Sequence, residues 1–462
     1  MARIINIKGF DFSKPTVAVP DQQDNILHFP SATNRLKWID TDEFSCETYP
    51  FFPAILDSNG SPWYEGCCFI LDSFKWISPP PYRTLEGVAE DLKKFKSWCE
   101  VNNVDYKSRS DFKSGNPTYK FCRFLNDCIS QGELASKTAC RVMGRVQQFY
   151  RWLYFSERIE TLEGLWLEDQ KSVSFINRNG DKQYKNTIST DLLKYLSRAV
   201  QKQQDDYIQD GGKLKPLKNS EQTLLKNVLQ KSPNIEMRLA ITIAISTGAR
   251  LSTVFTLRQK HFLASLDSDE PYKLIKIGGN SLVKNKNDKQ MMLLIPRSVY
   301  FWAQTYITSP RYKKRLAVSE HEFKQSVHEY MFLKNNGKAY FMTERDANVV
   351  KYNKPPRGGD VQQFISKSLN TKLRQLKNGF QFRFHDLRAT FGINILEWEL
   401  RRLKYSDDRS DKELFNLLNF IRERMGHEKM ATTEAYLRFH SSQARQQIVQ
   451  AEYESYMLDW LQ

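Results

Sequence analysis

Apolar residues recur at every third or fourth position in several long stretches, a spacing that places them on one face of a helix. Between 80 and 205 this spacing occurs three times, and Thr84 offers a side chain suited to cap the first helix. A further helix is expected in the more polar chain that follows. The predicted helices lie at about 84–99, 119–129, 136–154 and 190–204. Residues 80–205 are therefore predicted to form a small helical domain that ends in a linker helix.

A second core is predicted in the C-terminal half. Leu239–Ile245 is apolar almost all round, which indicates a buried helix. Two short runs, Tyr272–Ile277 and Met291–Pro296, are predicted to be strands joined by a glycine pair and a lysine-rich loop. Later, apolar residues at helical spacing end at Gly426, which suits the position just past a helix end. Residues 216–462 are predicted to form a mainly helical domain with a small antiparallel sheet.

The remaining segments are less regular. Residues 1–79 are rich in proline, aspartate, asparagine and aromatic residues, and short runs such as Cys67–Leu71 are interpreted as strands. The run Pro79–Pro81 is interpreted as the end of this accessory region. The polar, glycine-containing stretch 206–215 is predicted to be a linker between domains. A tail helix is expected over 441–462, packed either on its own domain or on a neighbouring protomer.

Composition narrows the class of partner. The chain has 462 residues and a net charge of +16, which favours a polyanion. Nucleic acid is the leading candidate, because the sequence has neither a long apolar span nor an N-terminal hydrophobic run that would indicate a membrane. The seven cysteines are odd in number and form no Cys-x-x-Cys pair, so neither a disulfide framework nor a zinc site is expected. This usage is typical of a reducing cytoplasm.

Five residues at expected helix junctions suit chemistry on a phosphodiester. Arg250 follows the buried helix, and His385 and Arg388 are three positions apart, so they share one helix face. His427 follows Gly426, and Tyr436 lies nine positions later (436 − 427). Arginines can donate forked hydrogen bonds to phosphate oxygens, and histidines can add donors or relay a proton. Nearby cations would favour the phenolate of the tyrosine as a nucleophile.

This ordered set resembles the tyrosine recombinase (phage integrase) family. The matching pieces are Thr247-Gly-Ala-Arg250, His385-Asp-Leu-Arg388, Met425-Gly-His427 and Tyr436, in the family's order and over roughly the C-terminal half of the chain. The resemblance implies a multi-domain architecture, with a helical core-binding domain before a mixed α/β catalytic domain. It also implies cleavage and rejoining of DNA through a 3′-phosphotyrosyl intermediate, without a cofactor, ATP or metal. The expected partners are double-stranded DNA attachment sites, a homotetramer on DNA and possible accessory or excision factors.

The resemblance also assigns basic residues. A lysine in the loop between the two strands would act as the general acid, and Lys286 is preferred to Lys284. Lys284 and Lys289 would then contact DNA. On the helix 136–154, the stripe Lys137, Arg141 and Arg145 is either a DNA contact of the core-binding domain or a charged, solvated face.

Two departures from the family pattern remain. Many relatives place a carboxylate three residues after the first arginine, where this chain has Thr253, so the orienting acid must come from elsewhere or be absent. The 39 positions between Arg388 and His427 (427 − 388) exceed the usual spacing, and the polar segment 401–411 accounts for the excess. The basic segment 311–315 is interpreted as part of an insertion.

Three readings of function stay open at this point. The first is a bacterial, nucleoid-associated integrase of a mobile genetic element. The second is a type IB topoisomerase-like or telomere-resolving enzyme, which would share the same chemistry. The third is a DNA-binding regulator or architectural protein that does not cleave.

Overall fold

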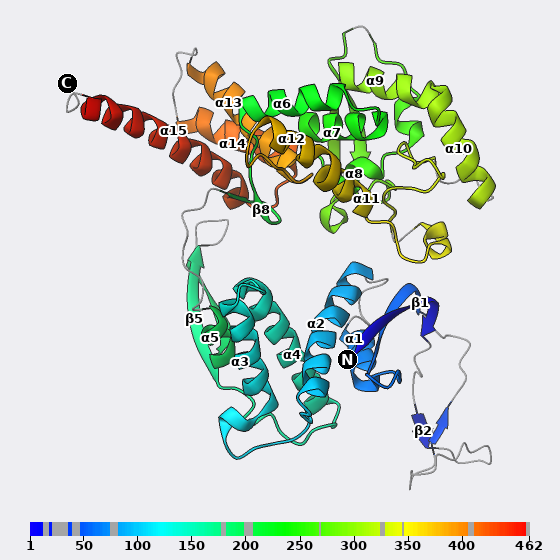
Figure 1. Cartoon of the computed structure of the whole chain (residues 1–462), viewed down its shortest axis with the longest axis vertical. Helices are drawn as coiled ribbons and strands as arrows, with labels where there is room; N and C mark the ends of the chain where they lie inside the picture. Colours follow the sequence, from blue (N-terminus) through cyan, green and yellow to red (C-terminus); the bar gives the residue numbers. More distant parts are fainter. Residues whose placement is uncertain are drawn as a thin grey trace. The chain divides into compact units, whose positions relative to one another are not determined.

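The computed structural model describes residues 1–12, 18–20, 36–38, 47–73, 82–176, 182–197, 207–267, 269–323, 329–343, 346–404 and 411–458. The chain divides into two compact units, Met1–Gln203 and Gln204–Gln462 (Figure 1). The sequence features Cys46, Pro79–Pro81 and Trp460 lie outside the described residues. Both units are mainly helical with small antiparallel sheets, which confirms the predicted fold class.

The first unit is built on three long helices that match the prediction. These are α2 (Tyr82–Val101), α3 (Pro117–Ser130) and α4 (Ser136–Phe155). The side chains at helical spacing on each, such as Phe95 and Phe149, are fully buried in one core. The fourth predicted helix is α5 (Asp191–Ser197) over its described part.

The N-terminal residues pack on the same core. Strand β1 (Arg3–Phe12) pairs antiparallel with β4 (Glu47–Leu56), while β2 (Ala18–Pro20) pairs with β3 (Leu36–Trp38). The predicted strand at 67–71 was wrong, because it lies in helix α1 (Tyr64–Ser73), which buries Phe69 and Ile70 against the helices. An apolar run this short does not distinguish a strand from a helix.

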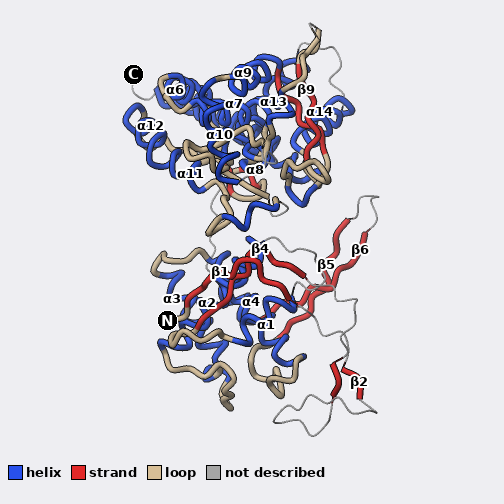
Figure 2. Tube along the Cα trace, turned by 90° about the vertical axis from the view of Figure 1, so that its right-hand side faces the viewer, coloured by secondary structure: helices blue, strands red, loops and turns tan. Residues whose placement is uncertain are grey.

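A second feature of this unit was not predicted. Strands β5 (Glu168–Ile176) and β6 (Lys182–Thr190) form a long antiparallel hairpin, visible in Figure 2, in the stretch interpreted as polar chain. Ser172, Ser174 and Tyr184 along it are exposed. Both strands are composed mainly of polar residues, so the sequence holds little apolar alternation to detect.

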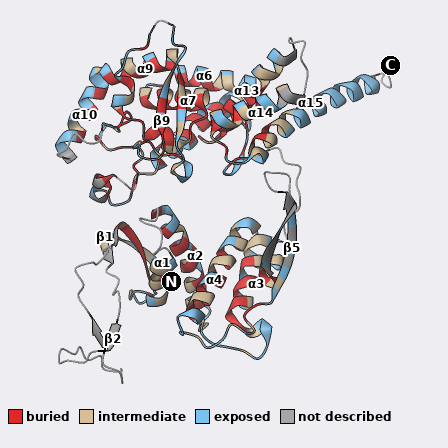
Figure 3. Ribbon diagram, turned by 180° about the vertical axis from the view of Figure 1, so that it is seen from behind, coloured by how far each residue is buried: buried red, intermediate tan, exposed pale blue. Residues whose placement is uncertain are grey.

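In the second unit the predicted buried helix is α7 (Ile235–Thr247), drawn largely in the colour of buried residues in Figure 3. It contacts α13, β10, α8 and α9. The predicted hairpin is β9 (Tyr272–Ile277) with β10 (Met291–Pro296), in the register Met291↔Ile277. The other helices are α6 (Asn219–Gln230), α8 (Leu251–Phe255), α9 (Arg297–Thr308), α10 (Pro310–Phe323), α11 (Gly359–Gln363), α12 (Asn370–Leu376), α13 (Asp386–Lys404), α14 (Asp411–Met425) and α15 (Met430–Leu458).

Two expectations for this unit need correction. The basic segment 311–315, interpreted as part of an insertion, is tied to the core: it lies in α10, where Arg311 and Arg315 both pair with Glu236, a fully buried carboxylate of α7. A buried carboxylate needs such partners. The expected tail helix does not begin at 441: it is the outer part of one continuous helix, α15, which also carries Tyr436, because no glycine or proline interrupts Met430–Leu458.

Over the described residues, no helix is both long and apolar enough to cross a membrane.

Candidate active site

Helix ends place the candidate residues. Helix α7 stops at Gly248, whose φ of +68° lets the chain turn, and Arg250 then caps α8. A side chain at Gly248 would also collide with Phe391, 2.5 Å from the position of its Cβ. Arg388 lies in the first turn of α13, and His427 follows the end of α14. Only a glycine at 248 satisfies both the turn and the close packing.

Tyr436 lies in α15 and is fully buried. Its ring packs against Gly392 of α13, where an added Cβ would lie 2.5 Å from Cε1 of the ring. Met425, at the end of α14, borders the same space. The phenol is therefore held in a close-fitting seat between three helices.

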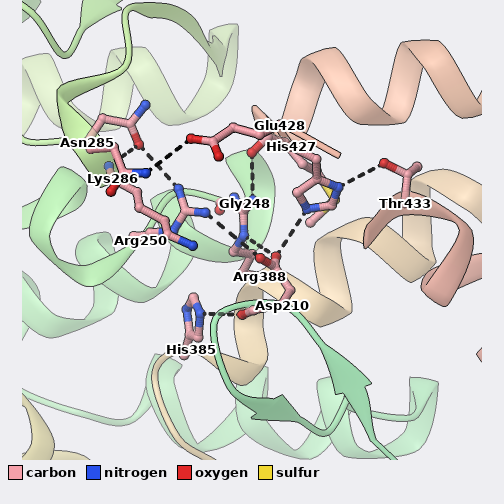
Figure 4. Close-up of polar contacts among 12 residues, drawn as sticks. Asp210, Gly248, Arg250, Asn285, Lys286, His385, Arg388, His427, Glu428 and Thr433 are labelled. Atoms are coloured by element: carbon pink, nitrogen blue, oxygen red, sulfur yellow. Dashed lines mark hydrogen bonds and ion pairs between the residues drawn. The ribbon is translucent and has the colours of Figure 1, made fainter. Parts of the chain in front are cut away.

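Asp210 lies at the centre of the site. It stands at the tip of a hairpin formed by β7 (Ile208–Gln209) and β8 (Lys213–Leu214). One carboxylate oxygen, Oδ2, accepts hydrogen bonds from Arg388 Nε at 2.7 Å and His427 Nε2 at 3.1 Å (Figure 4). The same oxygen accepts a third hydrogen bond, from the Tyr436 hydroxyl, at 3.1 Å. The other oxygen, Oδ1, is 3.9 Å from a terminal nitrogen of Arg250. Four of the five predicted residues thus converge on one carboxylate.

The location of Asp210 corrects the prediction of a linker at 206–215. The described part, 207–215, is an ordered hairpin of the second unit, and the carboxylate at its tip is 4% exposed. Sequence reasoning missed Asp210: the lack of an acid at position 253 left open whether an orienting acid comes from elsewhere or is absent. A single aspartate before two glycines has the local pattern of a turn, so nothing nearby in sequence identified it.

Arg388 joins the helix ends that form the site. Besides its bond to Asp210, it donates to the carbonyl of Gly248 at 2.8 Å and to the carbonyl of Met425 at 2.6 Å. These carbonyls end α7 and α14, and the guanidinium is 3% exposed. Three different nitrogens of the guanidinium serve these three acceptors. A lysine also has three donors, but all of them lie on one nitrogen, so they cannot reach acceptors that are spaced around a guanidinium.

The histidines occupy opposite sides of Asp210. His427 Nε2 faces the carboxylate, and its Nδ1 lies 3.0 Å from the Thr433 hydroxyl. His385 Nε2 lies 3.1 Å from the backbone carbonyl of Asp210. Burial lowers the pKa of both imidazoles, so both are neutral at pH 7. A neutral imidazole can accept a proton during a reaction.

The pKa values of the groups at this site depend on one another. Burial alone would raise the pKa of the Asp210 carboxyl, but hydrogen bonds from His427 and the charge of Arg388 hold it far below its ordinary value. Burial, with the charge of Asp210, raises the pKa of Tyr436 well above that of a free phenol. Burial beside Arg388 lowers the pKa of Arg250 to about 10. Tyr436 is therefore a protonated phenol that donates to a carboxylate.

The lysine-rich loop lies beside Arg250. Asn285 is buried and accepts a hydrogen bond from Arg250 at 3.3 Å. Thr253 donates to the backbone carbonyl of Lys284 at 2.8 Å, so position 253 anchors this loop instead of supplying an acid. Lys286, next to Asn285, and Lys289 are exposed, while Lys284 is half-buried.

The basic stripe belongs to the first unit. Lys137 is exposed, Arg141 pairs with the buried Asp91, and Arg145 donates to Gln148 at 2.7 Å. Two of its three cations thus already have partners within the unit.

Among the residues that the structure describes, no group of three or more histidine, cysteine, aspartate or glutamate side chains could hold a metal ion.

A pH dependence of stability follows from His261. Burial lowers its pKa from 6.5 to about 4, while its Nδ1 accepts a hydrogen bond from the backbone of Arg258 at 3.0 Å. Between these pH values the unfolded chain binds more protons than the folded chain, so stability falls as pH falls through this window. We expect a loss of roughly 1 kcal/mol from His261 at pH 5.5. His385 and His427 act in the same direction.

Urea unfolding at pH 7.0 and 5.5, at constant ionic strength, checks this expectation. His261→Asn is the matched variant, because its amide oxygen can take the place of Nδ1 as acceptor but does not titrate. The variant should lose less stability than the wild-type chain on acidification. Equal losses would show that His261 does not contribute.

Neither a protein-family model nor a curated protein matches this chain. The chain is similar to tyrosine recombinases of known structure. One is the XerH site-specific recombinase bound to palindromic difH substrate, with 15% identity, coverage of 79% of each chain and a TM-score of 0.44. Another is the Tn1549 transposon integrase in complex with circular intermediate DNA, with 14% identity, coverage of 80% of this chain and 94% of that one, and a TM-score of 0.42.

A lambda integrase dimer bound to a COC′ core site has 13% identity, covers 79% of this chain and 93% of its own, and has a TM-score of 0.39. These proteins are of the family that the sequence motifs resemble. At these identities the function of this chain has to be inferred from its own residues.

Proposed function

We propose that this protein is a site-specific DNA recombinase, an integrase of a mobile genetic element that cleaves and rejoins DNA through a 3′-phosphotyrosyl intermediate. The observation that carries the proposal is the convergence of Arg250, Arg388, His427 and Tyr436 on a single anionic group. Two guanidinium groups and an imidazole around one anion, with a phenol in hydrogen-bonding reach, suit the stabilisation of a phosphorane and in-line attack by the phenol.

In the proposed cleavage step, the Tyr436 oxygen bonds to phosphorus and the bond to the 5′ oxygen breaks. Arg250 and Arg388 neutralise the charge on the non-bridging oxygens. The phenol proton passes to a neutral imidazole, His427 or His385, because each has a lowered pKa. Lys286 gives a proton to the departing 5′ oxygen. The phosphotyrosyl bond retains the energy of the broken phosphodiester, so rejoining by reversal needs no nucleotide cofactor.

Double-stranded DNA is the proposed partner. The exposed Lys137 and Arg141 of the first unit and Lys284 and Lys289 of the loop are proposed to contact backbone phosphates. Arg145 is proposed to contribute when it leaves Gln148. Assembly as a homotetramer on DNA is supported by the outer part of α15, because four of its large side chains are more than half exposed. They are Ile448, Val449, Tyr453 and Tyr456. Packing on a neighbouring protomer would cover them.

The assignment of Lys286 predicts a specific rescue. Lys286→Ala should slow cleavage by roughly 10²–10⁴, the range for a lost general acid. A substrate with sulfur in place of the 5′ bridging oxygen needs almost no proton on its leaving group, so it should restore near-normal cleavage by this variant. The measurement is the single-turnover rate of adduct formation on the two substrates.

Lys284→Ala is the matched control and should behave as the wild-type chain on both substrates. Rescue in Lys284→Ala with no defect in Lys286→Ala would place the general acid two residues earlier.

Nicked duplexes that cover the DNA flanking the gene provide the test of the proposed function. Trapping on such substrates, followed by a denaturing gel, should reveal a covalent protein–DNA adduct. Lack of an adduct on every fragment, with sequence-specific binding retained, would support the non-cleaving regulator instead. Supercoil relaxation without recombination between two sites would support a topoisomerase-like enzyme.

A further inference from the structure

Three of the groups expected to bind or attack a phosphate, Arg388, His427 and Tyr436, are engaged by the side chain of Asp210. Its Oδ2 lies 2.7 Å from Arg388 Nε and 3.1 Å from both His427 Nε2 and the Tyr436 oxygen. A phosphorus atom attacked by Tyr436 must lie about 3–3.5 Å from that oxygen. Its own oxygens must take the bonds from Arg388 and His427. The carboxylate therefore fills the space that a reacting phosphate needs.

We propose that Asp210 is an internal substitute for the scissile phosphate, so that the described arrangement is a closed form and DNA opens the site by displacing Asp210. This inference rests on the proposed function and adds its regulation. A carboxylate and a phosphate both carry negatively charged oxygens, and both can accept paired hydrogen bonds from the guanidinium of an arginine. The site is thus neutralised from within when no DNA occupies it.

Burial supports a closed form. Tyr436 is 0% exposed, Arg388 is 3% exposed and His427 is 5% exposed. A phosphate in a duplex cannot reach donors that are covered to this degree. At least one covering element has to move before cleavage, and the hairpin that carries Asp210 is a short one.

The attachment of the hairpin is uneven. After the tip, the chain is held by bonds from Lys215 N to Asp386 at 3.0 Å and from Leu217 N to Thr390 at 2.9 Å. The tip itself contains Gly211 and Gly212, and each strand has only two residues. Before the tip, Ile208 is buried in the core around Tyr436. Because β8 is anchored, opening has to move the tip relative to β8. Either the Asp210 side chain alone rotates away, or the tip and Ile208 leave the core together.

The closed form would keep Tyr436 and Arg388 inactive until DNA displaces Asp210.

The competing explanation is that Asp210 stays in place and orients the arginines during catalysis. The two explanations differ in their effect on anion binding. If Asp210 occupies the phosphate position, removing its charge vacates a cationic pocket, and a free phosphate should bind there. If Asp210 only orients, its removal disorders the pocket and phosphate should bind no better.

The proposal is tested by isothermal titration calorimetry, which measures the affinity of the full-length protein for inorganic phosphate. Sodium chloride at matched ionic strength is the control titrant. Asp210→Asn keeps the size of the side chain and removes its charge, and Asp210→Ala removes the acceptors too. Both should bind phosphate roughly tenfold or more tightly than the wild-type chain, a change of about 1.4 kcal/mol per factor of ten. Phosphate should also stabilise both variants against heat, since it binds only the folded form.

Glu428→Gln is the matched control. Glu428 is an exposed acid that accepts a hydrogen bond from Asn287 at 3.2 Å beside the same loop, so this change removes one negative charge nearby without vacating the pocket. It should bind phosphate as the wild-type chain does. Adding Arg250→Ala to Asp210→Asn should abolish the gain, because it removes one of the donors.

Phosphate binding by Asp210→Asn and Asp210→Ala that is no tighter than in the wild-type chain would overturn the proposal, as would an equal gain in Glu428→Gln. Titration with phosphate does not depend on cleavage. A wild-type chain that forms no adduct would therefore contradict the proposed function without deciding the role of Asp210. Likewise, Asp210 variants that bind phosphate no more tightly would overturn the role of Asp210 without contradicting the proposed function.

Discussion

Tyr436→Phe is expected to give a folded, DNA-binding protein that forms no covalent adduct with DNA. The change removes only the oxygen proposed as the nucleophile. The ring keeps its seat against Gly392 and Met425, because the apolar contacts of a phenylalanine ring are nearly the same. The lost hydrogen bond to Asp210 should cost about 1.5–3 kcal/mol, the range for hydrogen bonds to charged groups.

Adduct formation on a nicked duplex, with binding measured in parallel by gel shift, provides the readout. Tyr453→Phe and Tyr456→Phe are matched controls on the same helix, since both tyrosines are more than half exposed and distant in sequence from the site. They should form adduct at the wild-type rate. An adduct that persists in Tyr436→Phe would show that the nucleophile is another residue.

The sequence was sufficient to predict Arg250, Arg388 and His427 as neighbours of Tyr436, but not Asp210. Each lies at a helix end that has its own local signal: Gly248 before Arg250, Gly426 before His427, and the start of α13 before Arg388. Such signals depend on backbone conformation and helical period, so they are legible over a few residues. The long helices of the first unit were predictable for the same reason.

Asp210 could not be predicted because its role is not local. It reaches Arg388 and Tyr436 across 178 and 226 positions, and its own neighbours only indicate a turn. The β5–β6 hairpin was missed because its strands are composed mainly of polar residues, so little apolar alternation appears in the sequence. The pairing of Glu236 with Arg311 and Arg315 was missed for a different reason. Charged residues are usually exposed, and the partners that allow Glu236 to be buried come together only in the tertiary structure.

Comparing the variants Arg388→Lys and Arg250→Lys distinguishes the contribution of each arginine to stability from its contribution to cleavage. A lysine at 388 keeps the charge but can serve only part of the set formed by Asp210, Gly248 and Met425. At least one buried carbonyl then lacks a donor, and each unpaired group costs about 1–3 kcal/mol. We expect Arg388→Lys to lose about 2–5 kcal/mol of stability in total.

Arg250→Lys should lose less than about 1 kcal/mol, because Arg250 is partly exposed and makes one hydrogen bond at 3.3 Å and an ion pair at 3.9 Å. Both variants should slow cleavage by roughly 10² or more, the effect of losing a preorganised donor to a transition-state oxygen. Urea unfolding and single-turnover cleavage, measured on the same preparations, supply the two values for each variant. Equal stability losses would contradict the view that Arg388 alone joins the helix ends, and normal cleavage by Arg250→Lys would remove Arg250 from the phosphate-binding set.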